Sequence, residues 1–297
     1  RELACEISQQ RGTPFYLAAR VAGSIEGCHR IGYDVERWIK EDLIDILIPA
    51  GAAGTDPAIE VNAFRSLIAD RAIALYPGFD GGVPGPVTGP EDEATRHNMR
   101  TKATALQYHQ QGATGIYAFN WHADRDSKRE LLSQVGKCET LQKQNKLYSI
   151  THRFRQETGP WRGAYKHDRL RGTLPVVLHP TFKETGPHFT LDLADDLLKF
   201  PPQHLTLRFR LQDWVDGDQV RFLLNDEPLI NPTINYCHHG DSNPISDVSN
   251  AAWHNFKLDA IEIPPGTHRI EAILLNRHPQ LACELVLTDI ELVVIYT

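Results

Sequence analysis

The chain has 297 residues, of which 41% are hydrophobic and 23% charged, and its formal net charge is −7. This composition is ordinary for a globular protein, and no lysine- and arginine-rich run is present, which argues against nucleic acid or an anionic membrane as the main partner. No apolar run approaches the roughly 18–20 residues needed to cross a bilayer. The five cysteines are scattered, with no Cys-x-x-Cys pair, so neither a zinc ribbon nor a disulfide framework is expected.

The first ten residues already resemble the interior of a helix. Leu3, Ala4 and Ile7 fall on one helical face, as the spacing of an amphipathic helix requires. No signal-peptide pattern is present. We therefore expect a fragment or a processed product that lacks an N-terminal part. The sequence does not indicate the cellular compartment.

The first half of the chain alternates between short apolar runs and longer amphipathic ones. The apolar runs, each continuous as in strands buried on both faces, are residues 15–21, 43–49, 73–76 and 115–121. The helical patterns are residues 34–41, 58–71, 91–111 and 127–144. Asp34 is placed to cap the first of these helices, and Gly112 follows the third as a C-cap glycine would.

Strand starts recur about every thirty to forty residues, which is the repeat of βα units. Four such units make half of a (β/α)₈ barrel. The predicted fold class is thus α/β plus all-β, with residues 1–158 forming strands five to eight of the barrel. An open flavodoxin-like sheet is the rival, although no glycine-rich phosphate loop follows any strand.

The pattern changes after a charged, glycine-containing linker at about residues 151–171. In residues 205–211, Leu and Phe alternate with Thr206, Arg208 and Arg210, which indicates a half-buried antiparallel strand. Turn signals separate further runs of this kind. The predicted strands are residues 190–193, 205–211, 220–224, 253–258, 267–275 and 285–296. We expect residues 159–297 to form an accessory β-sandwich, jelly-roll-like, that supports the barrel and houses no chemistry.

In a (β/α)₈ barrel the active site gathers at the carboxyl ends of the strands. The predicted catalytic residue there is Asp80, and the predicted substrate-binding residues are Arg20, Tyr76, Asn120, Trp121 and His122. Aromatic faces stack on sugar rings, and the polar groups exchange hydrogen bonds with sugar hydroxyls. This set therefore favours a carbohydrate ligand, with no cofactor.

Each candidate also has a purely structural interpretation. Arg20 could pair with a core carboxylate, and Asp80, before two glycines, could shape a turn. Trp121 could fill the core, and Asn120 and His122 could cap the following helix. Because all of them lie at the one edge where barrels place function, the joint pattern is stronger than any single member.

Glycoside hydrolysis generally needs two carboxyl groups, one acting as acid and one as nucleophile or base. Only Asp80 is well placed in this sequence. A second would come from early strands outside the chain, or from Asp56 or Asp124. Those strands, or another chain, are also expected to cover the open edges of a half-barrel.

Two patterns resemble metal sites. The run Cys237-His238-His239-Gly240-Asp241 has adjacent candidate ligands but no second group at a standard spacing. His122 with Asp124 and Asp126 is more typical of a solvated helix start, where acids face the positive end of the dipole. No metal is expected at either place.

Two segments resemble a known group: residues 32–51 (GYDVERWIKEDLIDILIPAG) and 111–121 (QGATGIYAFNW). They are similar to bacterial glycosyl-hydrolase-like proteins related to glycoside hydrolase family 10, and the resemblance covers about residues 1–150. It implies a TIM barrel acting on carbohydrate, followed by an accessory β domain. In related glycosidases the nucleophile follows the seventh strand, and Asp80 is the nearest match if residues 73–76 are that strand.

Two functions of different classes stay open. One is a glycoside hydrolase or a related carbohydrate-active enzyme. The other is a non-catalytic sugar-binding or cell-surface protein on a degenerate barrel. A barrel lyase or isomerase for phosphorylated sugars is disfavoured, because no glycine loop that could grip phosphate follows the third or fourth strand.

Overall fold

The computed structural model describes residues 1–51, 55–80, 91–121, 126–150, 173–180, 185–237 and 251–296. The chain forms two compact units that interleave along the sequence. Unit 1 consists of Arg1–Pro84, Ala105–Thr140 and Phe154–Arg171, and unit 2 of Gly85–Thr104, Leu141–Arg153 and Gly172–Thr297. The division therefore does not fall at a single point near residue 158, because two earlier segments belong to the second unit.

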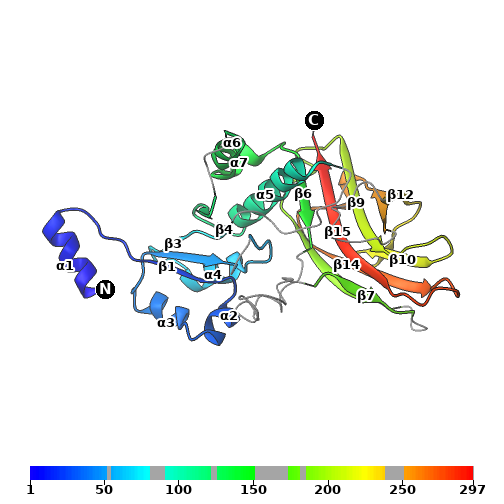
Figure 1. Cartoon of the computed structure of the whole chain (residues 1–297). Helices are drawn as coiled ribbons and strands as arrows, with labels where there is room; N and C mark the ends of the chain where they lie inside the picture. The colour runs from blue at the N-terminus through cyan, green and yellow to red at the C-terminus, as the bar shows by residue number, and fades with distance from the viewer. Residues whose placement is uncertain are drawn as a thin grey trace. The chain divides into compact units, whose positions relative to one another are not determined.

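Unit 1 contains a parallel sheet, in which Figure 1 labels β1, β3 and β4. Its strand order is β1-β2-β4-β5, and β3 pairs with β2. The strands are β1 (Ala18–Ala22), β2 (Ile46–Ala50), β3 (Ala74–Leu75), β4 (Gly78–Asp80) and β5 (Tyr117–Phe119). β1 pairs with β2 in parallel, from Ala18 opposite Ile46 to Ala22 opposite Ala50. The prediction of parallel pairing in this half of the chain is confirmed.

The third predicted strand is split into β3 and β4. Pro77 lies between them and has no N–H to donate to a ladder, so regular pairing stops there. The Pro77 carbonyl still accepts a hydrogen bond from the Tyr117 N–H at 3.1 Å. Asp80 thus ends a strand, whereas the sequence placed it in the following loop.

Helices lie between the strands, and two predicted caps are confirmed. The helices are α1 (Glu2–Arg11), α2 (Ile25–Arg30), α3 (Val35–Lys40), α4 (Val61–Ile68), α5 (Glu93–Gln110), α6 (Asp126–Val135) and α7 (Cys138–Leu141). The Asp34 carboxylate accepts the Arg37 N–H at 3.1 Å, and Gly112 has a φ of +94° after α5. No helix in the described part of the chain is both long and apolar enough to span a membrane.

Unit 2 is built on two antiparallel sheets, ordered β11-β10-β14-β8 and β12-β13-β9-β15-β6, with β7 also paired to β15. The strands are β6 (Lys146–Ser149), β7 (Val176–Leu178), β8 (His188–Leu193), β9 (His204–Gln212), β10 (Gln219–Leu224), β11 (Glu227–Pro228), β12 (Thr233–Cys237), β13 (Ala251–Lys257), β14 (Gly266–Asn276) and β15 (Leu285–Ile295). Phe209 of β9 and Phe222 of β10 stack 4.1 Å apart between the two sheets. All six predicted strands of this region are present.

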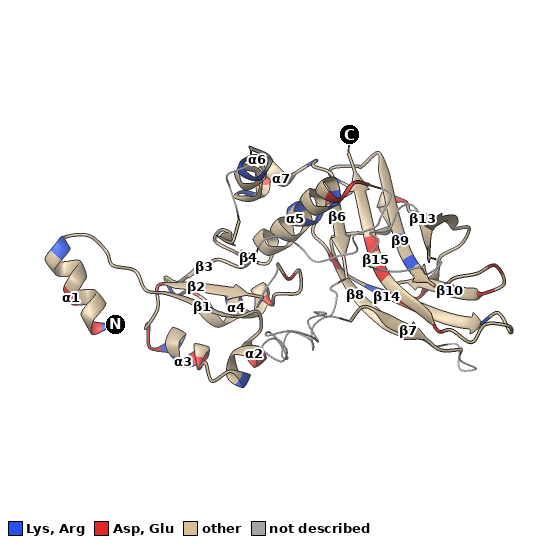
Figure 2. Cartoon of the chain, viewed as in Figure 1, with Lys and Arg blue, Asp and Glu red and all other residues tan. Residues whose placement is uncertain are grey.

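The two central strands of the larger sheet carry charge inside an otherwise apolar ladder, visible as blue on β9 and red on β15 in Figure 2. Leu205, Leu207, Phe209 and Leu211 are buried, as their alternation predicts. Arg208 was expected on the polar face of a half-buried strand but is only 3% exposed. Glu91, which precedes α5, and Glu291 of β15 bind its guanidinium, and residues 205–211 alone could not reveal these partners.

Candidate functional site

The carboxyl ends of β1, β2, β4 and β5 meet at one edge of the unit 1 sheet, because all four strands are parallel. The register aligns Gly78 with Tyr117 and Asp80 with Phe119. Positions paired in register share a face of a sheet. We call Arg20, Tyr76, Asp80, Tyr117 and Phe119 the carboxyl-edge site.

Arg20 reaches over the end of the sheet. Its Nη2 donates to the Gly51 carbonyl at 3.2 Å, and its guanidinium carbon lies 4.6 Å from the centroid of the Phe119 ring. The Arg20 side chain is exposed at the edge. A guanidinium at this distance over an aromatic face is held by a cation–π interaction, which is modest at an exposed position.

Tyr117 and Phe119 form an aromatic pair on one face of β5. Their rings are 6.5 Å apart and nearly parallel, with an interplanar angle of 14°, and Phe119 is 38% exposed. Neither residue was predicted, because the continuous apolar run of residues 115–121 indicates a strand buried on both faces. Their spacing of two, with both rings aromatic, is the signal that could have identified them.

Tyr76, a predicted substrate-binding residue, is half-buried beside Gly115. A Cβ on Gly115 would lie 2.6 Å from Cε1 of the Tyr76 ring, so the glycine makes room for that ring. The Tyr76 N–H donates to the Leu47 carbonyl at 2.9 Å, which continues the ladder beside β2. The ring is therefore positioned by the sheet itself.

Asn120 and Trp121 follow β5 but diverge from its exposed face. Asn120 has a φ of +50°, a left-handed conformation that Asn tolerates better than most residues. Trp121 is 7% exposed and stacks on Phe79 at 5.9 Å, while its indole N–H donates to the Lys128 carbonyl at 3.2 Å. Lys128 Nζ lies 4.6 Å from the Trp121 ring centroid. Trp121 thus packs within unit 1.

Some of the predicted chemistry falls outside what the structure describes. His122 and Asp124 lie outside the described residues, as do His238, His239 and Asp241. Asp80 is described by its backbone alone. The Asp56 carboxylate accepts the Ala58 N–H at 2.9 Å, as in a turn. Across the described ranges, no three His, Cys, Asp or Glu side chains are grouped to hold a metal ion.

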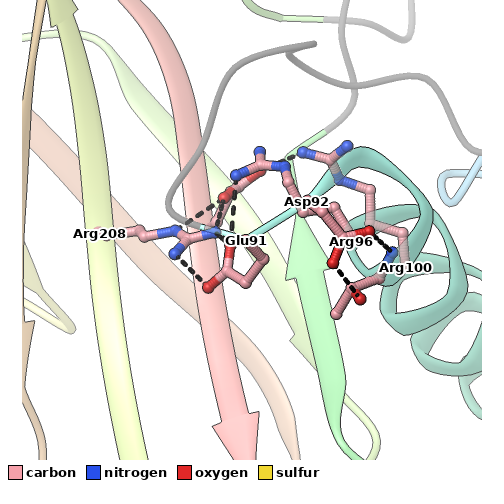
Figure 3. A network of polar contacts seen from close by, with 7 residues as sticks. Glu91, Asp92, Arg96, Arg100 and Arg208 are labelled. Carbon is pink, nitrogen blue, oxygen red and sulfur yellow. Dashed lines mark hydrogen bonds and ion pairs between the residues drawn. The ribbon is translucent and has the colours of Figure 1, made fainter. Parts of the chain in front are cut away.

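Unit 2 contains a second group of charged residues, and these are buried. Figure 3 shows Arg96 and Arg100 reaching from α5, and Arg208 from the sheet, to shared carboxylates. Arg96 Nη2 lies 2.9 Å and Arg208 Nε 2.8 Å from the carboxylate of Glu291, which Arg100 also contacts. We call Glu91, Arg96, Arg100, Arg208 and Glu291 the Glu291 cluster.

The arginines keep the buried Glu291 carboxylate ionised. Burial alone would raise the pKa of Glu291, but the guanidinium groups of Arg100, Arg208 and Arg96 outweigh it and lower that pKa to about 2. Arg208 also binds both oxygens of Glu91, at 2.9 and 2.8 Å. Its guanidinium carbon lies 4.8 Å from the Trp253 ring centroid. This cluster joins the first half of α5 to β9 and β15.

No family model and no curated protein matches this chain. Among solved structures, it is similar to a cycloisomaltooligosaccharide glucanotransferase from Paenibacillus sp., complexed with cycloisomaltoheptaose. The identity is 12%, the match covers 85% of this chain and 35% of that chain, and the TM-score is 0.21. This chain therefore spans about a third of the length of that enzyme.

The chain is also similar to a two-domain esterase active on acetylated mannans, co-crystallised with mannopentaose. Here the identity is 8%, the match covers 87% of this chain and 74% of that chain, and the TM-score is 0.22. A further structure of a two-domain esterase active on acetylated mannans is 10% identical. That match covers 93% of this chain and 79% of that chain, and the TM-score is 0.20. Likenesses this weak establish neither a shared fold nor a shared activity, so the function rests on the residues of this chain.

Proposed function

We propose that the carboxyl-edge site binds a sugar and that the protein is a carbohydrate-active enzyme, a glycoside hydrolase. The observation that carries this proposal is the Arg20 guanidinium 4.6 Å over the Phe119 ring, with Tyr117 stacked beside it. The exposed Phe119 ring, with the half-buried Tyr117 stacked beside it, offers a face for a sugar ring, and an arginine at its rim offers donors to hydroxyl or ring oxygens. The polar and aromatic groups converge on one edge of one sheet.

The sheet geometry supports a half-barrel. Its parallel strands follow one another in chain order, as in a (β/α)₈ barrel. β1 and β5 are three strand spacings apart, about 14 Å in a flat sheet, yet Arg20 of β1 meets Phe119 of β5. Ala50 and Gly78 lie between them and are small, and a Cβ on Gly78 would lie 2.7 Å from that of Ala50. A concave sheet with Arg20 and Phe119 on its inner face accounts for this contact.

We also propose a family for this chain and a partner for the open edge of its sheet. It places the chain with the proteins related to glycoside hydrolase family 10. Among the described strands, β1 pairs with β2 alone. An unpaired strand edge invites pairing, and further strands of a barrel, from the same or another polypeptide, would cover it.

In this proposal Asp80 is the catalytic carboxylate, as nucleophile or base, because it ends β4 in register with Phe119. Hydrolysis requires a second carboxyl group, about 5 Å away for a retaining enzyme and about 6.5–9.5 Å away for an inverting one. The second group would donate a proton to the leaving oxygen. Arg20 and the aromatic pair would hold the sugar ring against Asp80.

One observation favours the second candidate, a non-catalytic sugar-binding protein. Among the described strand positions that share the face of Arg20 and Phe119, Asp80 is the single carboxylate. A binding site needs the aromatic pair and Arg20 but no carboxyl pair. The two candidates therefore differ in turnover, while both predict sugar binding.

The test is a screen of the protein on aryl glycosides and polysaccharides, with turnover and binding measured separately. Asp80→Asn removes the charge at nearly constant volume, and turnover should fall by roughly three orders of magnitude or more while binding persists. Asp70→Asn, an exposed aspartate of the same unit, is the control. Normal turnover in Asp80→Asn removes Asp80 from the mechanism, and binding without turnover in the unsubstituted protein favours the non-catalytic candidate.

A further inference from the structure

A second exposed aromatic surface lies in unit 2, on the edge strand β12. Ile234 and Tyr236 are two positions apart and are 37% and 42% exposed. Their partners across the ladder are His254 and Ala252 of β13, both buried. The inner face of the larger sheet thus continues outward at this edge, where it ends in an aliphatic side chain and an aromatic ring.

The Tyr236 ring is fixed by its hydroxyl. The hydroxyl donates to Asp216 Oδ1, in the connection between β9 and β10, and this bond is the main reason that the pKa of Tyr236 is raised. The Trp214 indole N–H lies close enough to offset part of that shift, but it completes no hydrogen bond among the described residues. Trp214 is 6% exposed and packs edge-on against His254 at 4.4 Å. The hydrogen bond to Asp216, close to the packed Trp214, therefore holds the exposed Tyr236 ring in place.

Asp216 places an acceptor beside that ring. Its side chain is exposed, and within the described ranges the Tyr236 hydroxyl is the one donor that contacts its carboxylate. A fixed aromatic face beside an exposed carboxylate is suited to a sugar ring, whose C–H face stacks on the aromatic ring while its hydroxyls donate to the acid. Because the ring is already immobilised, little conformational freedom is lost on binding.

From this arrangement we infer that the Tyr236 platform, made of Ile234, Tyr236 and Asp216, is a second binding site for a neutral sugar chain. A protein partner would also cover exposed apolar residues, but it does not require an acceptor fixed at the rim of the ring. The site belongs to unit 2 alone and does not depend on the carboxyl-edge proposal. It gives unit 2 a binding role of its own.

The test follows the indole N–H signals of the five tryptophans by ¹H–¹⁵N NMR. The full chain is titrated with cellohexaose, xylohexaose, mannohexaose and maltohexaose, and the Trp214 signal is identified by its loss in Trp214→Phe. At least one hexaose should shift the Trp214 signal saturably. Tyr236→Ala should weaken that affinity on the order of tenfold, whereas Tyr236→Phe keeps the ring and should weaken it only about threefold.

Two controls separate this site from other effects. Ile261→Ala removes an aliphatic side chain that is 74% exposed elsewhere on unit 2, and Phe119→Ala alters the carboxyl-edge site; neither should change the affinity reported by Trp214. The inference is overturned if no hexaose moves the Trp214 signal, or if Tyr236→Ala binds as tightly as the unsubstituted chain. It is also overturned if sedimentation shows self-association that Tyr236→Ala abolishes while no hexaose binds.

Discussion

Two arginine–aromatic pairs in this molecule have nearly the same geometry and opposite surroundings. Arg20 lies 4.6 Å over Phe119 at an exposed strand edge, and Arg208 lies 4.8 Å over Trp253 in a buried layer. Arg208 is 3% exposed and bound to two glutamates. The aromatic contact is shared, so the comparison between the pairs concerns how far each guanidinium is exposed to water.

Desolvation explains why the two pairs have different consequences. A buried charge is stable only when partners replace its hydration, and removing one partner leaves the others uncompensated. An exposed charge keeps its water, so its contribution to folding is small and it can exchange water for a ligand. The Glu291 cluster should therefore govern the stability of unit 2, and the carboxyl-edge site should govern ligand binding.

The largest effect is expected for Glu291→Gln. Three guanidinium groups would then face a neutral amide in a buried layer, and the free energy of unfolding should fall by about 3–5 kcal/mol. Urea denaturation measures this change. Glu26→Gln, which breaks the exposed pair of Glu26 with Arg30, should change stability by less than about 0.5 kcal/mol. Equal losses in the two variants would remove the distinction between buried and exposed pairs.

The next largest effect is the pH dependence of the free energy of unfolding, which the buried His254 should produce. Burial lowers the pKa of His254 to about 4, so the folded protein favours the neutral ring. A histidine with a lowered folded pKa stabilises the fold above its ordinary pKa of about 6.5, and this contribution is lost as pH falls toward about 4. Between about pH 7.5 and about pH 5 the loss should be about 2 kcal/mol.

His254→Phe tests this origin, because the phenyl ring does not titrate. Urea denaturation at both pH values should show the loss in the unsubstituted protein and little of it in the variant. A matched control is His204→Phe, since His204 is exposed on β9 and should leave the pH dependence intact. An unchanged pH dependence in His254→Phe would contradict the assignment.

A smaller effect is expected at the carboxyl edge. Phe119→Ala removes the ring under Arg20 and should weaken sugar binding by about 1–2 kcal/mol, with little change in stability. Phe15→Ala is the matched control, because Phe15 is 39% exposed, against 38% for Phe119, but precedes the amino end of β1. Calorimetric titration with the sugar found in the screen measures both. Equal losses of sugar affinity in Phe15→Ala and Phe119→Ala would contradict sugar binding at this edge.

Local patterns in the sequence predicted the elements but not their distant partners. Continuous apolar runs predicted the parallel strands, and the alternation in residues 205–211 predicted β9, because burial on one or two faces leaves a periodic trace. β6 was missed because its partner, β15, lies at the far end of the chain. Arg208 was expected on the polar face of that strand for the same reason, since its partners Glu91, Trp253 and Glu291 come from distant parts of the chain.

The residues of the candidate site were likewise predictable only in part. Parallel strands carry their carboxyl ends to one edge, so the sequence could predict that Arg20 and the end of β5 lie close together. It could not predict that the left-handed Asn120 turns the chain before Trp121, which then packs on Phe79. Trp121 was consequently proposed as a binding face, and the half-buried Tyr117 and the exposed Phe119 were overlooked.

The most direct test of the account compares Arg20→Ala with Arg208→Ala, measuring unfolding by urea and sugar affinity by calorimetry in each. Arg20→Ala should weaken binding at the carboxyl edge by about 1–2 kcal/mol and change stability by less than about 1 kcal/mol. Arg208→Ala should lower the free energy of unfolding by about 3 kcal/mol and leave the affinity of the folded protein unchanged. A large stability loss in Arg20→Ala with unchanged affinity would contradict the account.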